Sequence, residues 1–350
     1  MREWTMEGMT VTLHLEAEAG QRAAGQRPSD PGRIPEQSDV EAGPTTLVAL
    51  EPPAGLDPPA ATPRLWLVAA GASPAWRRAE LLLSRDGGGS YDAVGIVGPG
   101  AIAGRLSTPL ANGPADVWDL AATVDVELLA DAMALSGRPD AALWDGANLA
   151  IVGDELIQFS FADQIGPRHW RLHRLLRGRR GSSAGPHPAG VAFALLASDT
   201  VVAVDLPLSA VGTSVLVKAV GPADAAGDVQ AVPVFISGRS VRPLSPARLD
   251  VAVTPLGDMR ITWVRRSRDG FAWIDGADTP LAEEREAYRL TIGSGPNARI
   301  IESTVSAATY LHAERLSDGF ASPLAVEVRQ LGAGVGAGDA IVQQFALVQP

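Results

Sequence analysis

Serine, histidine and acidic residues occur in several arrangements that could support catalysis. Residues 181–185 read GSSAG and match the G-x-S-x-G pattern, in which a strained strand-to-helix turn exposes a nucleophilic serine. Pro186 and Pro188 follow at once. Because two prolines cannot begin the helix that would hold such a turn, the pattern indicates an ordinary turn or loop.

Two further pairs could be ligands or acid–base groups. His169 and His173 are four residues apart, which is about 13 Å along a strand and too far for shared metal coordination. Asp154 and Glu155 are neighbours, and adjacent strand residues face opposite sides of a sheet. We therefore expect a turn and a strand start at Asp154 and Glu155, and no metal site at the histidines.

The glycine-rich run 332–338, GAGVGAG, could in principle cradle a dinucleotide phosphate. It lacks the third glycine at the required spacing and no helix-forming sequence follows it, so it predicts a hairpin loop. The chain also contains no cysteine, which removes disulfides, thiolate metal ligands and cysteine nucleophiles. The sequence predicts a protein that is not an enzyme, with no catalytic residues, no cofactor and no metal.

The most unusual segment is 168–181, RHWRLHRLLRGRRG. Arginine suits phosphate and anionic polymers, but the net charge of −11 argues against nucleic acid as a partner. Alternating apolar residues favour a buried strand, followed by arginines whose charged hydrogen bonds lock a turn or an intersubunit contact. The candidate structural or interface residues are Trp170, Arg171, Leu175, Leu176, Arg177, Gly178, Arg179, Arg180 and Gly181.

The length and composition favour a multi-domain, all-β protein. A chain of 350 residues predicts two or three domains, and 37 glycines and 27 prolines favour short strands and turns over long helices. No apolar run approaches 18 residues, so no membrane span is predicted. Residues 1–19 predict a lone strand that completes a preceding domain or pairs with a neighbouring subunit. The proline-rich residues 20–63 predict a linker that is interrupted by the apolar run 46–50.

Residues 64–243 predict a β-rich domain. A turn at 162–168 separates two of its strands, and residues 128–135 suit either a strand or a short helix. The expected strands are 64–70, 79–84 and 91–97, of which the last two form a hairpin, and then 124–128, 148–152, 155–161, 169–176, 191–196, 201–206, 214–220 and 231–236.

Residues 244–350 predict a fibronectin type III-like β-sandwich. About seven strands fit in roughly 100 residues, with a tryptophan early and a tyrosine on a middle strand. The most regular alternating segments are 249–253, 259–264, 287–292, 308–311 and 324–330.

Several of these segments together carry a family resemblance. Residues 148–159 (NLAIVGDELIQF) and 175–181 (LLRGRRG), with Trp170, Arg171 and Leu172 between them, resemble the C-terminal part of the large baseplate hub protein of gene transfer agents and related siphophages of alphaproteobacteria. Residues 261–268, 280–284 and 288–290 look like the terminal fibronectin-like domain of that family, and residues 4–15 look like the closing strand of the preceding hub domain.

The resemblance implies a structural component of a phage or gene-transfer-agent tail tip. Residues 64–243 would be a fibre-binding baseplate domain, and the chain would form a homotrimer at the virion tail tip after synthesis in the bacterial cytoplasm. Its implied partners are fibres and other tail-tip or baseplate proteins, and a host surface glycan or receptor is a further candidate through host attachment. Full-length relatives carry an upstream glycosidase-related region without a counterpart here, so the resemblance implies no cell-wall-degrading activity.

A different class of function remains as the alternative. The chain could be an extracellular carbohydrate-binding or glycan-acting module of a multidomain protein, in which Trp118, Trp144 and Trp273 stack on sugars. Paired carboxylates in a cleft would favour a glycan-acting enzyme.

Overall fold

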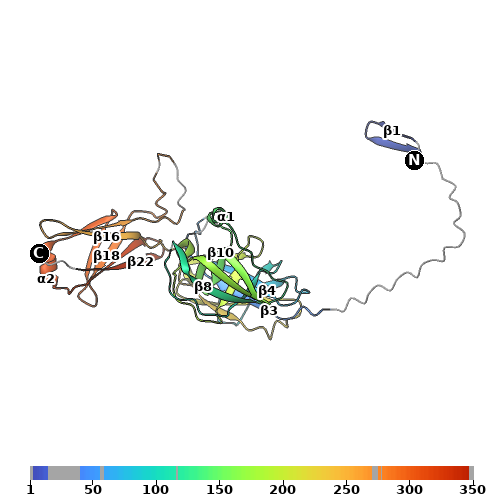
Figure 1. Cartoon of the computed structure of the whole chain (residues 1–350), viewed down its shortest axis with the longest axis horizontal. Coiled ribbons are helices and arrows are strands. Elements are labelled where there is room, and N and C mark those ends of the chain that lie inside the picture. The colour runs from blue at the N-terminus through green and yellow to red at the C-terminus, as the bar shows by residue number, and fades with distance from the viewer. Residues whose placement is uncertain are drawn as a thin grey trace. The chain divides into compact units, whose positions relative to one another are not determined.

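The chain forms an almost entirely β structure. The computed structural model describes residues 3–14, 40–55, 59–115, 117–269, 275–276 and 278–346, in which antiparallel strands predominate and helices are short (Figure 1). The predicted all-β, multi-domain class is confirmed. The chain divides into two units, Met1–Asp39 and Val40–Pro350.

The first unit contains a β-hairpin where a single strand was expected. Strand β1 (Glu3–Glu7) pairs with β2 (Thr10–His14), and the chain reverses at Gly8, whose φ of 62° suits a residue without a side chain. Val11 and Leu13 are exposed. Because a two-stranded hairpin alone is marginally stable, an additional sheet partner is still expected; its origin in a preceding hub domain stays a prediction.

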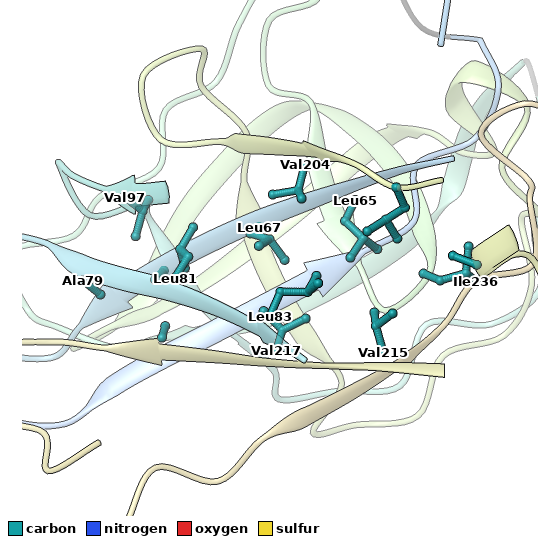
Figure 2. Packing of buried hydrophobic residues seen from close by; sticks show 14 of the residues in the cluster. Leu65, Leu67, Ala79, Leu81, Leu83, Val97, Val204, Val215, Val217 and Ile236 are labelled. Carbon is teal, nitrogen blue, oxygen red and sulfur yellow. The ribbon is translucent and has the colours of Figure 1, made fainter. Parts of the chain in front are cut away.

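The second unit begins with a two-sheet β-sandwich. Apolar side chains of both sheets meet in one core, where Leu65 and Leu67 face Leu81, Leu83 and Val217 (Figure 2). The first sheet has the order β13-β4-β3 and the second the order β15-β14-β5-β6. The bounds are β3 Thr45–Leu50, β4 Arg64–Gly71, β5 Ala79–Ser84, β6 Asp92–Val97, β13 Val202–Asp205, β14 Ser214–Val220 and β15 Val232–Phe235.

The predicted linker 20–63 is wrong for its C-terminal part. Strand β3 pairs with β4 along its whole length, and Glu51, Ala54 and Ala60 are buried. The prolines lie beside this strand, where they leave its hydrogen-bond ladder intact. Residues 40–55 and 59–63 therefore belong to the folded unit, whereas residues 20–39 lie outside the described part of the chain.

A closed six-stranded barrel is inserted into this sandwich between β6 and β13. Its strand order is β10-β11-β8-β7-β12-β9, and its interior is filled by apolar side chains including Val126, Phe159, Leu172 and Phe193. The predicted domain 64–243 thus contains two modules. The bounds are β7 Ala103–Leu106, β8 Trp118–Leu128, β9 Ala150–Val152, β10 Glu155–Gly166, β11 His169–Leu176 and β12 Ala192–Leu195, with a short helix α1 at Asp140–Trp144 and 3-10 turns at Arg179–Gly181 and Leu208–Ala210.

Two local predictions within the barrel need correction. The expected turn 162–168 is shorter, because β10 continues to Gly166 and the reversal takes place at Pro167 and Arg168, whose φ is 58°. Strand β8 ends at Leu128, and residues 129–135 form neither a strand nor a helix.

Strand β4 is buried on both faces and joins the sandwich to the barrel. Its residues Leu65 and Leu67 enter the sandwich core, while Val68 and Ala70 pack with Ile151 of the barrel wall. A strand covered on both sides has a continuous apolar run in its sequence, and the expected strand 64–70 has this pattern.

In the described residues after 246, seven strands form a second sandwich. One sheet has the order β16-β17-β20 and the other the order β19-β18-β21-β22, the two-sheet architecture of fibronectin type III domains. Trp263 meets Tyr288 edge to face at 5.0 Å between centroids, and the glycine-rich run 332–338 lies at the β21–β22 hairpin, as predicted. The bounds are β16 Ala247–Val253, β17 Met259–Val264, β18 Tyr288–Ile292, β19 Arg299–Ser303, β20 Ala307–Tyr310, β21 Leu324–Gly332 and β22 Gly336–Phe345, with α2 at His312–Asp318; β19 and β22 were not predicted.

The revised boundary predicts different effects of two truncations. A chain that starts at Val40 should melt like the full chain, whereas one that starts at Arg64 loses Val48 and Leu50, which are each 5% exposed. Burial of two such side chains contributes at least about 3 kcal/mol, so its melting temperature should fall by on the order of 10 °C in calorimetry. Equal melting of both truncated chains would contradict the assignment of β3 to the sandwich.

Candidate functional site

The arginine-rich segment 168–181 forms strand β11 and the turn after it. Leu175 and Leu176 are buried, and Trp170 packs partly buried against the barrel core with its indole Nε1 lacking a hydrogen-bond partner. Arg171 points outward and donates two hydrogen bonds to Asp125 on β8, at 2.7 and 2.8 Å. The outer face of the barrel therefore carries a bidentate ion pair.

Arg177 is fully buried and lies at the centre of the segment's contacts. Its Nε and Nη2 donate to the two carboxylate oxygens of Glu155, at 2.7 and 2.8 Å. Nη1 donates to the carbonyl of Ala111 at 3.0 Å, and Nη2 also donates to that of Gly185 at 2.7 Å. These hydrogen bonds compensate the buried guanidinium for the loss of its hydration.

Two more groups complete the surroundings of the Glu155 carboxylate. Gly178 donates its backbone N–H to Oε1 at 2.9 Å, and His187 places Nε2 at 2.8 Å from Oε2. Glu155 has the same strand parity as Ile157 and Phe159, which fill the barrel, so its carboxylate points to the interior. The Glu155–Arg177–His187 cluster, referred to below as the buried ionic cluster, closes the barrel where β10 begins and β11 ends.

The turn after Arg177 requires its glycines. Gly178 and Gly181 have φ values of 63° and 85°, which favour a residue without a side chain. A Cβ at Gly178 would lie 2.9 Å from the Cβ of Ala115, and one at Gly181 would lie 2.7 Å from a methyl carbon of Leu244. The turn is thus packed against two distant parts of the chain.

The two arginines between these glycines also have defined places. Arg179 donates from Nε to Gln158 Oε1 at 2.7 Å. Arg180, with a φ of 56°, has its Cζ 5.9 Å from the ring centroid of Trp66. Within this chain, arginine hydrogen bonds therefore hold the turn against β10, and the intersubunit contact stays a prediction.

The other sequence-predicted groups are separate. Ser183, the central serine of the GSSAG pattern, is exposed in the loop after the 3-10 turn. Its neighbour Ser182 is packed, since Ser182 Oγ accepts a hydrogen bond from the Leu156 N–H at 3.0 Å and donates to the Arg179 carbonyl at 2.9 Å. His169 contacts the Pro167 carbonyl and His173 contacts Asp163. In the described ranges, histidine and acidic side chains form no group of three suited to a metal ion, and no helix is long and apolar enough to cross a bilayer.

Sequence reasoning missed the partners in the buried ionic cluster. Glu155 was correctly placed at a strand start, and β10 begins there, but its carboxylate was not linked to Arg177. His187, which lies between Pro186 and Pro188, was not among the predicted site residues. No spacing pattern connects these residues, because closure of the barrel alone brings them together.

A second feature is an ionic row on the outer face of the barrel. The hydrogen bonds from Arg171 lower the pKa of Asp125, although partial burial opposes this. The neighbouring Arg105 likewise lowers the pKa of Glu127, and Arg168 adds a longer contact at 3.4 Å. Both carboxyl groups are thus held in the ionised form below their ordinary titration range.

A third feature is an aromatic cluster beside helix α1. Trp118 and Trp144 meet edge to face with centroids 5.8 Å apart, and Arg174 places its Cζ 4.3 Å from the ring centroid of Trp118. Arg174 donates two hydrogen bonds of 2.8 Å to Asp140. Of the three tryptophans considered for sugar stacking, these two lie together, and Trp273 lies outside the described residues.

Comparison with known proteins identifies a family match for the barrel. A family model described as Rcc01698-like, C-terminal, matches residues 101–194, and the strands of the barrel run from Ala103 to Leu195. This family is of the kind seen in gene transfer agent and phage proteins. The matched segment and the closed barrel therefore have nearly the same limits.

No curated protein matches the chain. Among solved structures, domains A168–A170 of titin match with 11% identity over 81% of this chain and 74% of that chain, at a TM-score of 0.22. A likeness at that score carries no argument.

The buried ionic cluster predicts a large effect of one conservative change. Glu155→Gln leaves the buried Arg177 guanidinium without its counter-charge, which should cost about 3–5 kcal/mol of unfolding free energy in urea denaturation. Arg177→Met added to Glu155→Gln should cost less than the sum of the two single changes. The exposed Glu80→Gln is the matched control and should stay within about 0.5 kcal/mol; a Glu155→Gln variant as stable as this control would contradict the role of the cluster.

The outer ionic row predicts acid sensitivity. Because the pKa of Asp125 is lowered in the folded protein, its pair with Arg171 stabilises the fold above the unfolded pKa of about 3.9, and this contribution is lost as pH falls through the folded pKa. Urea midpoints measured from about pH 6 to pH 2 should decline less in Asp125→Asn. The control Asp154→Asn, at an exposed carboxyl in the turn before β10, should follow the wild-type curve; identical curves for all three proteins would disprove the prediction.

Proposed function

We propose that this chain is a structural component of the tail tip of a phage or gene-transfer-agent particle. In that role it belongs to the baseplate hub, docks fibres or other tail-tip proteins and contributes to host attachment. The observation that carries the proposal is the agreement between the barrel, Ala103 to Leu195, and the match at 101–194 to a family of that kind.

The physical design of the matched region supports a scaffold. A closed barrel has no free sheet edge, and the buried ionic cluster uses a glutamate, an arginine and a histidine to hold strands and turns together. The insertion is fixed to the sandwich by the doubly buried β4. Such a body can carry load and present surfaces at fixed geometry.

The N-terminal hairpin supports assembly with other chains. Met6, Val11 and Leu13 are all more than half exposed, and a two-stranded ribbon needs a further sheet for stability. In the proposed homotrimer at the virion tail tip, a neighbouring subunit or the preceding hub domain supplies that sheet.

One observation favours the alternative of a carbohydrate-binding module. Trp144 is 59% exposed and lies beside Trp118, whereas most tryptophans serve as core residues. This surface is compatible with a tail-tip protein that contacts host glycans, so the two functions are not exclusive.

The proposal predicts that the chain purifies with particles. Intact particles from the native producer, separated on a density gradient, should contain the full chain in mass spectrometry of the tail-tip fraction. Chemical cross-linking within those particles should join copies of the chain to each other and to a fibre protein through residues of 64–243.

Particles from a producer that lacks the gene are the control and should be missing or tail-defective. If the chain is abundant in the lysate but absent from infectious or transducing particles, the proposed function is wrong.

A further inference from the structure

Trp144 is the most exposed tryptophan side chain in the described part of the chain for which burial is assigned, and its ring is held in place. It is the last residue of α1 and is 59% exposed. Trp118 contacts it edge to face at 5.8 Å, and Arg179 lies with Cζ 5.9 Å from its ring centroid. An aromatic ring fixed in this way can receive a ligand with little loss of conformational freedom.

Hydrogen bonds from strand β10 hold the helix that carries Trp144 in place. Gln158, which is 1% exposed, donates from Nε2 to the carbonyls of Leu143 and Ala147, at 2.7 Å each. Its Oε1 in turn accepts the hydrogen bond from Arg179. A short helix would fray alone, so these bonds define where the tryptophan stands.

Polar groups with spare hydrogen-bonding capacity lie beside the ring. Asp140, on the same helix, accepts one hydrogen bond at each carboxylate oxygen from Arg174, although a carboxylate offers about four acceptor positions. The side chains of Asp140 and Arg174 are 43% and 33% exposed. Acceptors and donors are therefore available to solvent in fixed orientations.

Arg174 is placed by an irregularity in the barrel wall. The pairing of β11 with β8 shifts register between His173 and Leu175, and Arg174 takes a positive φ of 54°. The bulge turns its side chain toward Asp140 and over the ring of Trp118. Bulges commonly redirect a side chain in this way next to binding sites.

We propose that this surface, formed by Trp118, Asp140, Trp144, Arg174 and Arg179, binds a neutral pyranose unit of a glycan. The apolar C–H face of the sugar stacks on the exposed surface of the Trp144 ring, whose π-electrons attract it. Vicinal hydroxyl groups donate to Asp140 and accept from Arg174. This inference deepens the host-attachment part of the proposed function.

The Arg174–Asp140 pair, whose charges cancel, favours a neutral sugar over a phosphate or sulfate. Arg174 is neutralised by Asp140 at 2.8 Å, and the protein carries a net charge of −11, which repels polyanions. The surface also suits a sugar better than a protein partner, because stable protein interfaces bury about 800 Å² on each side. Helix α1 with its five residues offers one fixed ring and one ion pair.

The test is direct binding of soluble sugars to the full chain. Tetrasaccharides based on glucose, galactose, mannose and N-acetylglucosamine are offered separately and followed by saturation-transfer NMR and isothermal titration calorimetry. At least one should bind with a dissociation constant on the order of 1 mM or tighter. Trp144→Ala should weaken that binding by at least about tenfold, and Trp144→Phe, which keeps an aromatic face, should retain part of it.

Phe235→Ala is the matched control, since Phe235 is an equally exposed aromatic, at 60%, on strand β15. It should leave sugar binding unchanged. If no tetrasaccharide binds, or if Trp144→Ala binds as well as Phe235→Ala does, the glycan site is disproved.

Particle purification separates this outcome from failure of the proposed function. A chain that is present in tail tips but binds no sugar retains the structural role and loses the glycan site. A Trp144→Ala chain that assembles poorly into particles, with no sugar bound by wild type, would mean that the surface docks a protein.

Discussion

The pairing of Arg177 with Glu155 organises the barrel. Burial of two charges is costly unless geometry and additional hydrogen bonds compensate, and here the compensation is extensive. The guanidinium reaches two backbone carbonyls as well as the carboxylate, and the carboxylate also receives Gly178 and His187. These contacts join the start of β10, the end of β11 and the loops before β8 and β12, so closure of the barrel and satisfaction of the charges occur together.

Apolar packing between the sandwich and the barrel holds the inserted barrel in one orientation. A barrel joined to a sandwich by two chain crossings could rotate as a separate domain. Here the outward-facing side of β4 packs against Ile151, Leu156 and Ala194 of the barrel wall, so rotation would expose apolar surface on both modules. The family match covers the barrel alone, whereas the fixed orientation comes from the sandwich around it. The proposed scaffold role would therefore depend on both modules together.

The sequence predicted those elements whose signal is local. The continuous apolar run of β4 and the alternating residues of β14, β17 and β21 identified strands, and the all-β class followed from turns and composition. Strand β3 was read as part of a linker because prolines flank it, although its partner β4 begins 14 residues after it ends. Proline content indicates only the local backbone preference. Residues 45–50 form a strand because β4 is available as a pairing partner.

The sequence did not predict the long-range contacts that form when the barrel closes. Glu155 meets Arg177 across 22 residues and His187 across 32 residues. Trp118, at the start of β8, meets Trp144, at the end of α1, where α1 packs against β10. None of these three pairs has a characteristic spacing. The arginine-rich segment was recognised as unusual, but whether its guanidinium groups face the interior or the solvent depended on strand parity and on the bulge at Arg174.

Because successive side chains of a strand point to opposite faces, the arginines of residues 168–181 have different roles. Arg177 points inward and holds the barrel closed, while Arg171 points outward and pairs with Asp125. Arg174, displaced by the bulge, is the one that pairs with a half-exposed carboxylate and covers one tryptophan beside another. An inward arginine is unavailable to any ligand, and an outward arginine on a regular strand meets mainly its cross-strand partner. Within residues 168–181, the bulge is the one place where the backbone brings a guanidinium, a carboxylate and aromatic rings together at the surface. For this reason the proposed recognition lies there and not along the rest of the segment.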